Sequence, residues 1–441
     1  MRMDLLDLFP ISTQVKPEHG GLWIGECNLS SLAQEWGTPL YLYDAATLQT
    51  QARLIRRLLG AAYPGPSLVA YAAKTYFSFG MARKLSVMGL GVDCVSLAEL
   101  DIARQAGFPP GKAHLHGNNK SSEELEAAMD WGIQSIVVDS LEELGFLEDL
   151  AQHFDRCNVR IWLRVTPGLT VDTHPYRQTG HTASKFGLPL QDGQAAEAIR
   201  RAMASQRLKL VGLHTHLGSQ LFEAEPYQEA LRSLGRLAYE QGFVPEEISP
   251  GGGWGVPYHP DDPLAPVERW IEGVSQTTVS MAKEYGWPLP RLVLEPGRWL
   301  VARAGVALYT LGTTKILPDG SRVAAVDGGM ADNPRPALYQ SRYTACLAER
   351  PLAQPVQNWR VVGKYCESGD LLIQDVPLPE FLRGDLLAMP VSGAYQLSMA
   401  SNYNLAPRPA VLWLEHGQVE CLQVREKPSQ AGWWSGGGVP N

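Results

Sequence analysis

Short apolar runs alternate with amphipathic segments between residues 67 and 295, and this alternation dominates the hydrophobic pattern of the chain. Each run has the length of a buried strand and ends at polar or glycine-containing residues. We therefore predict eight strands in this region. They are Ser67–Ala73, Gly91–Val95, Ala113–His116, Ser135–Asp139, Val159–Val165, Leu208–His214, Glu246–Ser249 and Leu292–Glu295.

The segments between these runs repeat apolar residues at helical spacing. Two of them begin with a capping-box pattern, at Ser121–Glu124 and at Ser140–Glu143. Eight strand–helix units over about 250 residues favour a (β/α)8 TIM-like barrel, although a doubly wound sheet would show the same alternation. The predicted helices include Ser96–Ala106, Glu123–Trp131, Leu141–His153, Ala195–Ser205, Tyr227–Gln241 and Pro266–Tyr285.

After residue 305 the pattern changes to short apolar runs separated by glycine, proline and aspartate turns, which is typical of antiparallel β structure. One similar run, Leu22–Cys27, lies near the N-terminus. We predict an N-terminal segment, 1–36, that packs with a C-terminal antiparallel β domain, 306–441, and a barrel over 37–305. The last residues, from Lys427, are predicted to form a loose tail. The β-domain strands are predicted at Ala304–Leu311, Arg322–Val326, Trp359–Gly363, Asp385–Pro390, Ala410–Leu414 and Gln418–Val424.

Composition narrows the class of protein. The 441 residues are 45% hydrophobic, which supports a sizeable core, and the net charge of −8 with no basic block argues against nucleic acid as a partner. No segment approaches the ~20 apolar residues of a membrane span, and the N-terminus lacks the pattern of a signal peptide. The six cysteines form no CxxC pair. We therefore expect a cytoplasmic protein without a zinc ribbon or a disulfide framework.

Polar residues gather where the predicted strands end, which is where the active sites of barrels lie. Lys74 closes the first strand, and low-dielectric surroundings there would favour its neutral, nucleophilic amine. A surface lysine that caps the strand is the alternative. Glu295 ends the eighth strand. It could be half of a structural ion pair, or it could pair with a protonated pyridine nitrogen.

A second group of residues suggests an anion site. Gly251, Gly252 and Gly253 would let backbone N–H groups approach a phosphate, which commonly binds beside strands seven and eight of a barrel. A plain turn is the alternative. Arg298 and Ser219 could donate to the same anion, because guanidinium and hydroxyl groups both bind phosphate oxygens.

The pair His214 and His216 raises the question of a metal. The two residues straddle a strand end, so they would make a poor clamp unless the backbone bends, and no cysteine or acidic cluster at ligand spacing supports zinc. We therefore predict no metal site. We expect instead that the planar imidazole of His216 lies against a flat cofactor ring.

The C-terminal region adds three groups of polar residues. Cys366, at the start of a Cys-Glu-Ser-Gly-Asp turn, could transfer protons or could be a buried structural cysteine. Arg335 and Tyr339 lie four residues apart and could hold a carboxylate together, or could be ordinary loop residues. Tyr395 adds a phenol in another glycine-containing turn.

Together and in this order, the motifs resemble the pyridoxal-phosphate-dependent decarboxylases of the alanine-racemase-like barrel fold, from about Gly37 to about Pro409. Two of the runs are similar to the group in this family that converts meso-2,6-diaminopimelate to L-lysine and CO2, the last step of lysine biosynthesis; they are Arg335–Tyr339 and Cys366–Asp370. The other motifs are Tyr71–Lys74, His116–Ser121, His214–Gln220, Gly251–Gly253, Glu295–Arg298 and Gly393–Tyr395.

The resemblance implies pyridoxal 5′-phosphate as cofactor and an amino acid as substrate. Lys74 would bind the cofactor covalently, His216 would stack on its ring and Glu295 would pair with the ring nitrogen. Cys366 would be the second catalytic residue and would supply a proton. The cofactor phosphate would lie among Ser219, Gly251, Gly252, Gly253, Arg298 and Tyr395, and the substrate would contact Arg298, Arg335, Tyr339, Glu367 and Tyr395.

The resemblance also implies a homodimer in which Cys366 and Glu367 reach into the partner's site. Three alternatives stay open. The chain could decarboxylate another substrate, such as D-ornithine, D-lysine or a carrier-linked amino acid. It could bind the cofactor without catalysis, because fold does not determine function. A racemase is less favoured, since its second base is normally a tyrosine where this chain offers Cys366.

Overall fold

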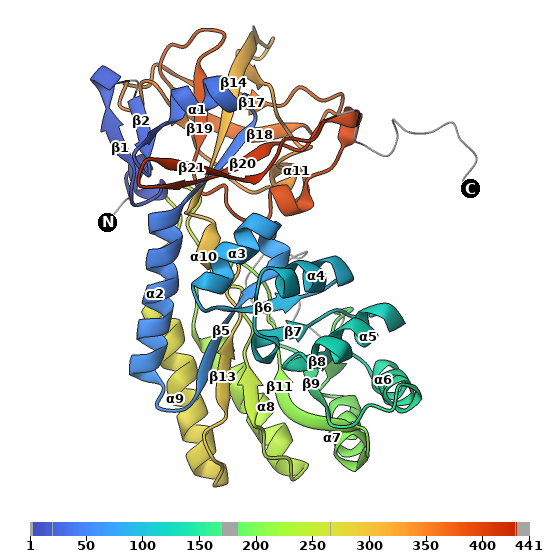
Figure 1. Cartoon of the computed structure of the whole chain (residues 1–441). Coiled ribbons are helices and arrows are strands. Elements are labelled where there is room, and N and C mark those ends of the chain that lie inside the picture. The colour runs from blue at the N-terminus through green and yellow to red at the C-terminus, as the bar shows by residue number, and fades with distance from the viewer. Residues whose placement is uncertain (1–2, 20, 170–183, 265, 428, 430–441) are drawn as a thin grey trace, which may run out of the picture. The chain divides into compact units, whose positions relative to one another are not determined.

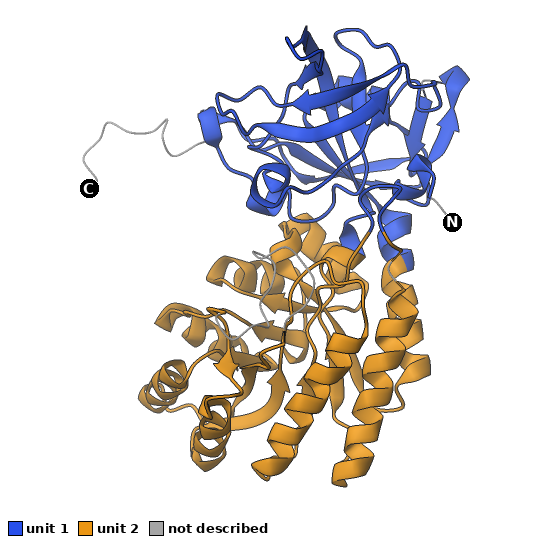
Figure 2. Ribbon diagram, turned by 180° about the vertical axis from the view of Figure 1, so that it is seen from behind, with its two compact units in different colours: residues 1–50, 257–262, 300–441 blue, residues 51–256, 263–299 orange. Residues whose placement is uncertain are grey.

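The chain forms two compact units, shown in separate colours in Figure 2. A computed structural model describes residues 3–19, 21–169, 184–264, 266–427 and 429. One unit, here called the barrel unit, contains residues 51–256 and 263–299, and the other, the β unit, contains residues 1–50, 257–262 and 300–441. Most of the tail predicted from Lys427 lies outside the described residues.

The barrel unit is a closed ring of eight parallel strands with helices on its outer side (Figure 1). Each strand pairs with the next, β13 pairs with β5, and β9 joins β8 to β11. The predicted barrel is therefore confirmed, and the doubly wound alternative is excluded because the ring has no open edge. The strands are β5 (Ser67–Ala72), β6 (Gly91–Cys94), β7 (Ala113–Leu115), β8 (Ser135–Val138), β9 (Val159–Thr166), β11 (Leu208–His214), β12 (Glu247–Ser249) and β13 (Arg291–Leu294).

The helices of the barrel unit begin mostly at serine caps that follow a strand. Ser121 and Glu124 form the predicted reciprocal capping box. Ser140 also caps its helix, but Glu143 does not return the bond, because its carboxylate accepts from the Asp139 N–H and pairs with Lys120. The helices that lie wholly in the unit are α3 (Phe79–Val87), α4 (Leu97–Gln105), α5 (Ser122–Trp131), α6 (Leu141–His153), α7 (Gln194–Ala204), α8 (Glu225–Glu240) and α9 (Val267–Tyr285), and most of α2 (Ala45–Ala62) lies there too.

The β unit is built on a mixed sheet in the order β18-β17-β15-β14-β4-β20-β21. Strand β19 also pairs with β14, and β16 (Cys346–Leu347) pairs with β19. Most pairings are antiparallel, as predicted, but β15 with β17 and β4 with β20 are parallel. The central strands are β4 (Leu40–Asp44), β14 (Gly305–Ile316), β15 (Arg322–Val326), β17 (Gln357–Val362), β18 (Leu371–Leu378), β19 (Leu386–Met389), β20 (Ala410–Glu415) and β21 (Gln418–Gln423).

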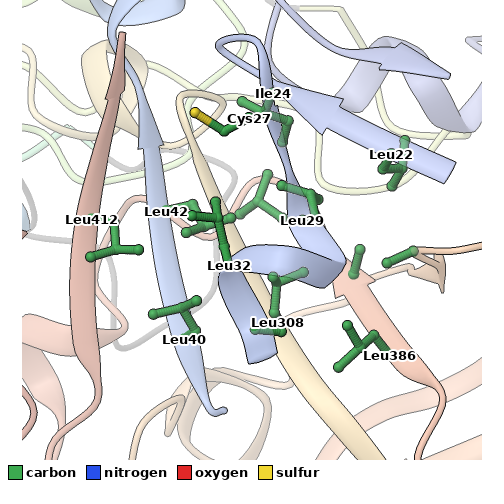
Figure 3. Close-up of a cluster of buried hydrophobic side chains, with 14 of the residues drawn as sticks. Leu22, Ile24, Cys27, Leu29, Leu32, Leu40, Leu42, Leu308, Leu386 and Leu412 are labelled. Carbon is green, nitrogen blue, oxygen red and sulfur yellow. The ribbon is translucent and has the colours of Figure 1, made fainter. Parts of the chain in front are cut away.

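The N-terminal residues share the hydrophobic core of the β unit (Figure 3). Leu22 in β2 (Gly21–Ile24) and Leu29 in α1 (Leu29–Trp36) are fully buried in one cluster with Leu308 and Leu386. Burying a leucine side chain contributes about 2 kcal/mol, so this cluster is a large part of the stability of the unit. The barrel was predicted to begin at residue 37. In the structure, residues 37–50 belong to the β unit, because β4 pairs with β14 and β20.

No helix in the described part of the chain is long and apolar enough to cross a membrane.

Candidate active site

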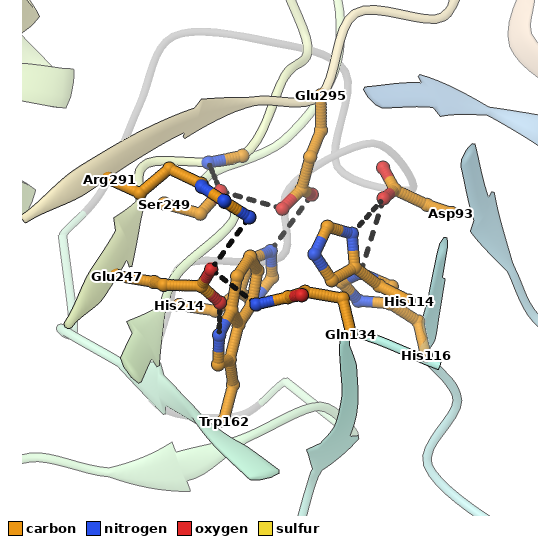
Figure 4. Close-up of polar contacts among 11 residues, drawn as sticks. Asp93, His114, His116, Gln134, Trp162, His214, Glu247, Ser249, Arg291 and Glu295 are labelled. Atoms are coloured by element: carbon orange, nitrogen blue, oxygen red, sulfur yellow. Dashed lines mark hydrogen bonds and ion pairs between the residues drawn. The ribbon is translucent and has the colours of Figure 1, made fainter. Parts of the chain in front are cut away.

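Glu295 follows β13 directly and lies inside the barrel among polar side chains from other strands (Figure 4). Its carboxylate accepts hydrogen bonds from Ser249 Oγ at 2.6 Å and from His214 Nε2 at 3.0 Å. Burial raises the pKa of Glu295, but the attraction of His214 and His116 and the two hydrogen bonds outweigh burial and hold the pKa well below its usual range. Glu295 is therefore an ionised carboxylate, as a partner for a pyridinium must be.

Two buried histidines flank Glu295. Burial lowers the pKa of His214 and, more strongly, that of His116, while the negative charge of Glu295 opposes both shifts. Their rings meet edge to face with centroids 4.9 Å apart. Because the carboxylate of Glu295 can only accept, Nε2 of His214 carries a proton. This contact between His214 and Glu295 was not predicted from the sequence, where His214 was paired only with His216.

His116, His214 and Glu295 also form a group that could hold a metal ion. They present ligand atoms that lie within 4.8 Å of one another. A closed tetrahedral zinc site needs a fourth ligand, and the ligand atoms of His214 and Glu295 are already bonded to each other.

Asp93 is a second buried carboxylate beside Glu295. Burial and the charge of Glu295 raise the pKa of Asp93 well above its usual range, while the charge of Lys74 opposes that rise. The side chain lies 3.2 Å from His114 Nδ1. The pKa values of the two carboxylates are thus shifted in opposite directions, an arrangement that enzymes use to separate roles. His114 and His116 lie two residues apart, so both side chains point to the same face of a strand. This spacing in the sequence could have predicted the cluster.

Lys74 stands in a short 3₁₀ turn, Ala73–Thr75, just beyond β5. Low-dielectric surroundings were predicted for its amine, but the side chain is exposed. The strand ends at Ala72, and the turn carries Lys74 out of the apolar layer. Its positive charge still lowers the pKa values of Asp93 and His216. Lys74 therefore lies within electrostatic range of both residues, at the end of the barrel that contains Glu295.

The glycine triplet packs tightly between the ends of β11 and β13. An added Cβ at Gly252 would lie 2.0 Å from the carbonyl oxygen of Glu295, and one at Gly253 would lie 2.0 Å from that of Gly218. Gly251 and Gly253 also have φ values of 77° and 96°, which favour glycine. Each position therefore requires glycine for space, and two require it for backbone geometry as well.

Only part of the triplet can serve an anion. The Gly251 N–H donates to Ser249 Oγ at 3.0 Å, and the Gly252 N–H donates to His216 Nδ1 at 3.4 Å. Two of the three amides therefore have acceptors inside the protein. The bond from Gly252 orients the His216 ring instead. Burial, with the charge of Lys74, lowers the pKa of His216 well below its usual range, so this imidazole is neutral.

Arg298 and Ser219 lie together, as the sequence analysis expected of an anion site. Arg298 is buried, and its Nη2 donates to Ser219 Oγ at 2.9 Å. The two residues come from the segments that follow β13 and β11, which are the strands on either side of the glycine triplet. A guanidinium, a hydroxyl and a glycine-rich turn at this end of the barrel match the donor set for a phosphate.

Arg164 is a buried cation that the predicted site did not include. It lies in β9, its guanidinium stacks over the Phe186 ring at 4.4 Å, and its Nε is 3.8 Å from Asp139. Burial lowers the pKa of Arg164, whereas Asp139 and Glu295 oppose that shift. An arginine within an otherwise apolar strand was the sequence signal for this residue.

The remaining predicted residues belong to the β unit. Cys366 and Glu367 are exposed in the turn, as the polar composition of that turn suggested. Asp370 at the end of the turn is buried and accepts from the Met330 N–H at 2.6 Å and the Tyr365 N–H at 2.8 Å. The exposed thiol is therefore presented by a turn whose other end is fixed inside the unit.

Arg335 begins α11 (Arg335–Tyr339) and is almost completely buried. Its guanidinium lies 4.7 Å from the centre of the Tyr258 ring, and its Nη1 donates to the Tyr343 hydroxyl. Within the described residues no carboxylate forms an ion pair with Arg335. Tyr339 and Tyr395 are half-buried in the same unit, and Tyr395 has a φ of 58°.

The barrel unit thus combines the groups that pyridoxal phosphate requires. An amine stands at the rim within electrostatic range of a neutral imidazole, a buried ionised carboxylate lies in the same barrel, and a guanidinium–hydroxyl pair adjoins a glycine turn. Fold and site together define a pyridoxal-phosphate-dependent barrel enzyme. The family described as "Pyridoxal-dependent decarboxylase, pyridoxal binding domain" matches residues 46–302, so the chain belongs to the pyridoxal-dependent decarboxylases.

Within this family, the relatives that match nearly the whole chain are diaminopimelate decarboxylases. The chain is 40% identical to diaminopimelate decarboxylase of Bacillus subtilis (strain 168), over 95% of this chain and 96% of the relative. A solved diaminopimelate decarboxylase from M. jannaschii, in complex with L-lysine, has a TM-score of 0.87 at 30% identity and covers 98% of each chain. The Helicobacter pylori enzyme with L-lysine has a TM-score of 0.81 at 31% identity, over 91% of this chain and 98% of that one.

Proposed function

We propose that this chain removes CO2 from meso-2,6-diaminopimelate to yield L-lysine, with pyridoxal 5′-phosphate as cofactor. The relatives that share about 40% identity over nearly the whole chain bear the name of this activity. The single structural observation that carries the proposal is that Glu295 is buried and ionised between Ser249 and His214. The charge of Lys74 acts on Asp93, which lies beside Glu295 in the same barrel.

The barrel residues would prepare the cofactor for this chemistry. When bound, pyridoxal phosphate supplies an electron sink for the electron pair that remains on the α-carbon as CO2 leaves. Glu295 would stabilise a proton on the ring nitrogen, and Lys74 would hold the cofactor covalently. The imidazole of His216, oriented by the Gly252 N–H, would support the flat ring. Arg298 and Ser219 would hold the phosphate.

The β unit would select the substrate. The distal end of meso-2,6-diaminopimelate is a second amino-acid centre, with both an ammonium and a carboxylate. Glu367 would meet the ammonium, while Arg335, Tyr339, Arg298 and Tyr395 would serve the anionic groups. Cys366 would donate its thiol proton to the α-carbon that has lost CO2. Diamines and diamino acids that lack the distal carboxylate should bind much worse, because buried partners would then stay unpaired.

The site would be shared between two copies of the chain. We propose a homodimer in which Cys366 and Glu367 of one copy serve the partner's cofactor, and the exposure of both residues in the single chain supports this arrangement. We also propose that the enzyme works in the cytoplasm. All six cysteines are free, which suits a reducing compartment.

The test is a spectrum followed by a substrate panel. Purified protein should show the visible absorbance of bound pyridoxal phosphate and should release L-lysine from meso-2,6-diaminopimelate, but should act poorly on D-lysine and D-ornithine. Lys74→Ala should lose both signals, whereas Lys315→Ala, which changes an exposed lysine of β14, should keep them. Faster turnover of D-lysine would identify the alternative substrate, and full activity in Lys74→Ala would refute the site.

A further inference from the structure

Two exposed side chains hold the backbone of Cys366 from both sides. Asn404 Oδ1 accepts from the Cys366 N–H at 2.9 Å, and the Tyr403 hydroxyl donates to the Cys366 carbonyl oxygen at 2.9 Å. The ring of Tyr403 also meets that of Tyr365 edge to face, with centroids 6.5 Å apart. Both polar groups of the Cys366 backbone are thus satisfied by neighbouring residues of one short turn.

The turn that carries these side chains, Asn402–Leu405, is itself firmly attached. Asn402 Nδ2 donates to the carbonyl oxygen of Ala406 at 2.9 Å and to Glu426 Oε2 at 2.8 Å. Just before the turn, the Ser401 N–H donates to the Ala331 carbonyl oxygen at 2.8 Å. The turn is therefore fixed to two other segments of the β unit, and it can act as a rigid support for Cys366.

The backbone of the turn is unusual for its sequence. Asn404 and Leu405 have φ values of 53° and 56°. Asparagine tolerates this left-handed region, but leucine is strained in it. Exposed hydrogen bonds contribute little to net stability, so stability alone does not account for a strained turn that is tied to an exposed loop. Such strain is typical of sites where geometry serves function.

We propose that Tyr403 and Asn404 are positioning residues that aim the thiol of Cys366. The proposal rests on the proposed function, in which Cys366 donates the proton that replaces CO2. Neither side chain needs to touch the substrate. Asp370 accepts from the N–H of Tyr365, the residue before Cys366, so the backbone is held on both sides of the peptide bond between Tyr365 and Cys366.

The test compares Asn404→Gly and Tyr403→Phe with the wild type. Glycine suits the left-handed backbone but removes the acceptor, so a loss of activity in Asn404→Gly reports the hydrogen bond and not strain. We expect kcat for L-lysine release to fall about tenfold in each variant, with KM and the cofactor spectrum unchanged. Asn404→Asp keeps an acceptor at the same place and should recover most of the rate. Asn158→Gly is the matched control, since Asn158 is exposed with a φ of 58° in the barrel unit.

A double-mutant cycle decides whether the two residues act through Cys366. Asn404→Gly should not slow Cys366→Ala any further, because the group that it aims is already missing. Additive losses would overturn the proposal and leave the proposed function standing, as would wild-type kcat in both Asn404→Gly and Tyr403→Phe. Full activity of Cys366→Ala would overturn the role of the thiol and this proposal together.

A readout without substrate keeps the two hypotheses separate. Exchange of the Cys366 amide hydrogen with solvent should be about tenfold faster in Asn404→Gly than in the wild type or in Asn158→Gly, because its acceptor is lost. Unchanged exchange would refute the support by Asn404 whatever the enzyme acts on. Faster exchange in a protein that does not release L-lysine from meso-2,6-diaminopimelate would contradict the proposed function alone.

Discussion

At the scale of single residues, neighbours decide the charge of each group more than residue type does. Glu295 and Asp93 are both buried carboxylates in one barrel, yet their pKa values move in opposite directions. Glu295 accepts hydrogen bonds from Ser249 and His214, whereas burial and the charge of Glu295 raise the pKa of Asp93. The sequence predicted a carboxylate at position 295 and a structural or functional role for it, but not which protonation state it holds.

The charge of Glu295 can be tested by a change that keeps its shape. Glu295→Gln retains the volume but cannot carry a negative charge, so we expect kcat for L-lysine release to fall at least about 100-fold. Glu247→Gln makes the same change at a buried carboxylate that binds Trp162 and Gln134 in the barrel, and it should keep kcat. Similar kcat values for Glu295→Gln and the wild type would show that a neutral partner suffices.

At the scale of elements, apolar periodicity predicted the barrel strands to within one or two residues, and β11 and α6 as the structure has them. The misses have physical causes. All five residues of β4 are buried, because it lies between β14 and β20, and such a strand shows no alternation. β18 contains Asp375 and Pro377, which weaken a strand pattern. Contacts across the sheet override the local signal in both cases.

We expect Asp332, in the loop between β15 and α11, to make the stability of the β unit depend on pH. Burial raises the pKa of Asp332 from 3.8 to about 6, although hydrogen bonds from Tyr309 and Tyr41 oppose the rise. The folded β unit therefore binds this proton more tightly than the unfolded chain. Its contribution to stability is complete below about pH 4 and is lost as the pH rises through about 6.

Asp332→Asn should remove this dependence. Relative to the variant, the wild type should lose up to about 3 kcal/mol of unfolding free energy between pH 4 and pH 7. Denaturant unfolding of both proteins across this range measures the difference. A constant difference would show that Asp332 keeps an ordinary pKa in the folded state.

At the scale of the whole molecule, the predicted chemistry is divided between two units. Lys74, Glu295 and Arg298 lie in the barrel unit, whereas Arg335 and Cys366 lie in the β unit. The proposed dimer would join the barrel of one copy to the thiol of the other. If the site is shared between two copies, two inactive variants can complement each other, which a site built from one chain would not allow.

Two inactive variants should restore each other. In a heterodimer of Lys74→Ala and Cys366→Ala, one site loses both residues and the other regains both, so random mixing should recover about a quarter of wild-type activity. The assay is L-lysine release after joint refolding or co-expression, with each variant alone as the control. Heterodimers that are isolated and still inactive would show that each chain builds its own site.

The amino-acid sequence alone determined the order of strands and helices, the closed barrel as the favoured fold, and the chemical groups at the strand ends. These follow from apolar periodicity and from short motifs, which are local properties. Only the tertiary structure decided that Glu295 is hydrogen-bonded to His214 and Ser249, that the pKa of Asp93 is raised beside it, and that two of the three glycine amides are used inside the protein. These properties depend on groups from strands far apart in the chain, and burial and charge act between them only after the barrel has closed.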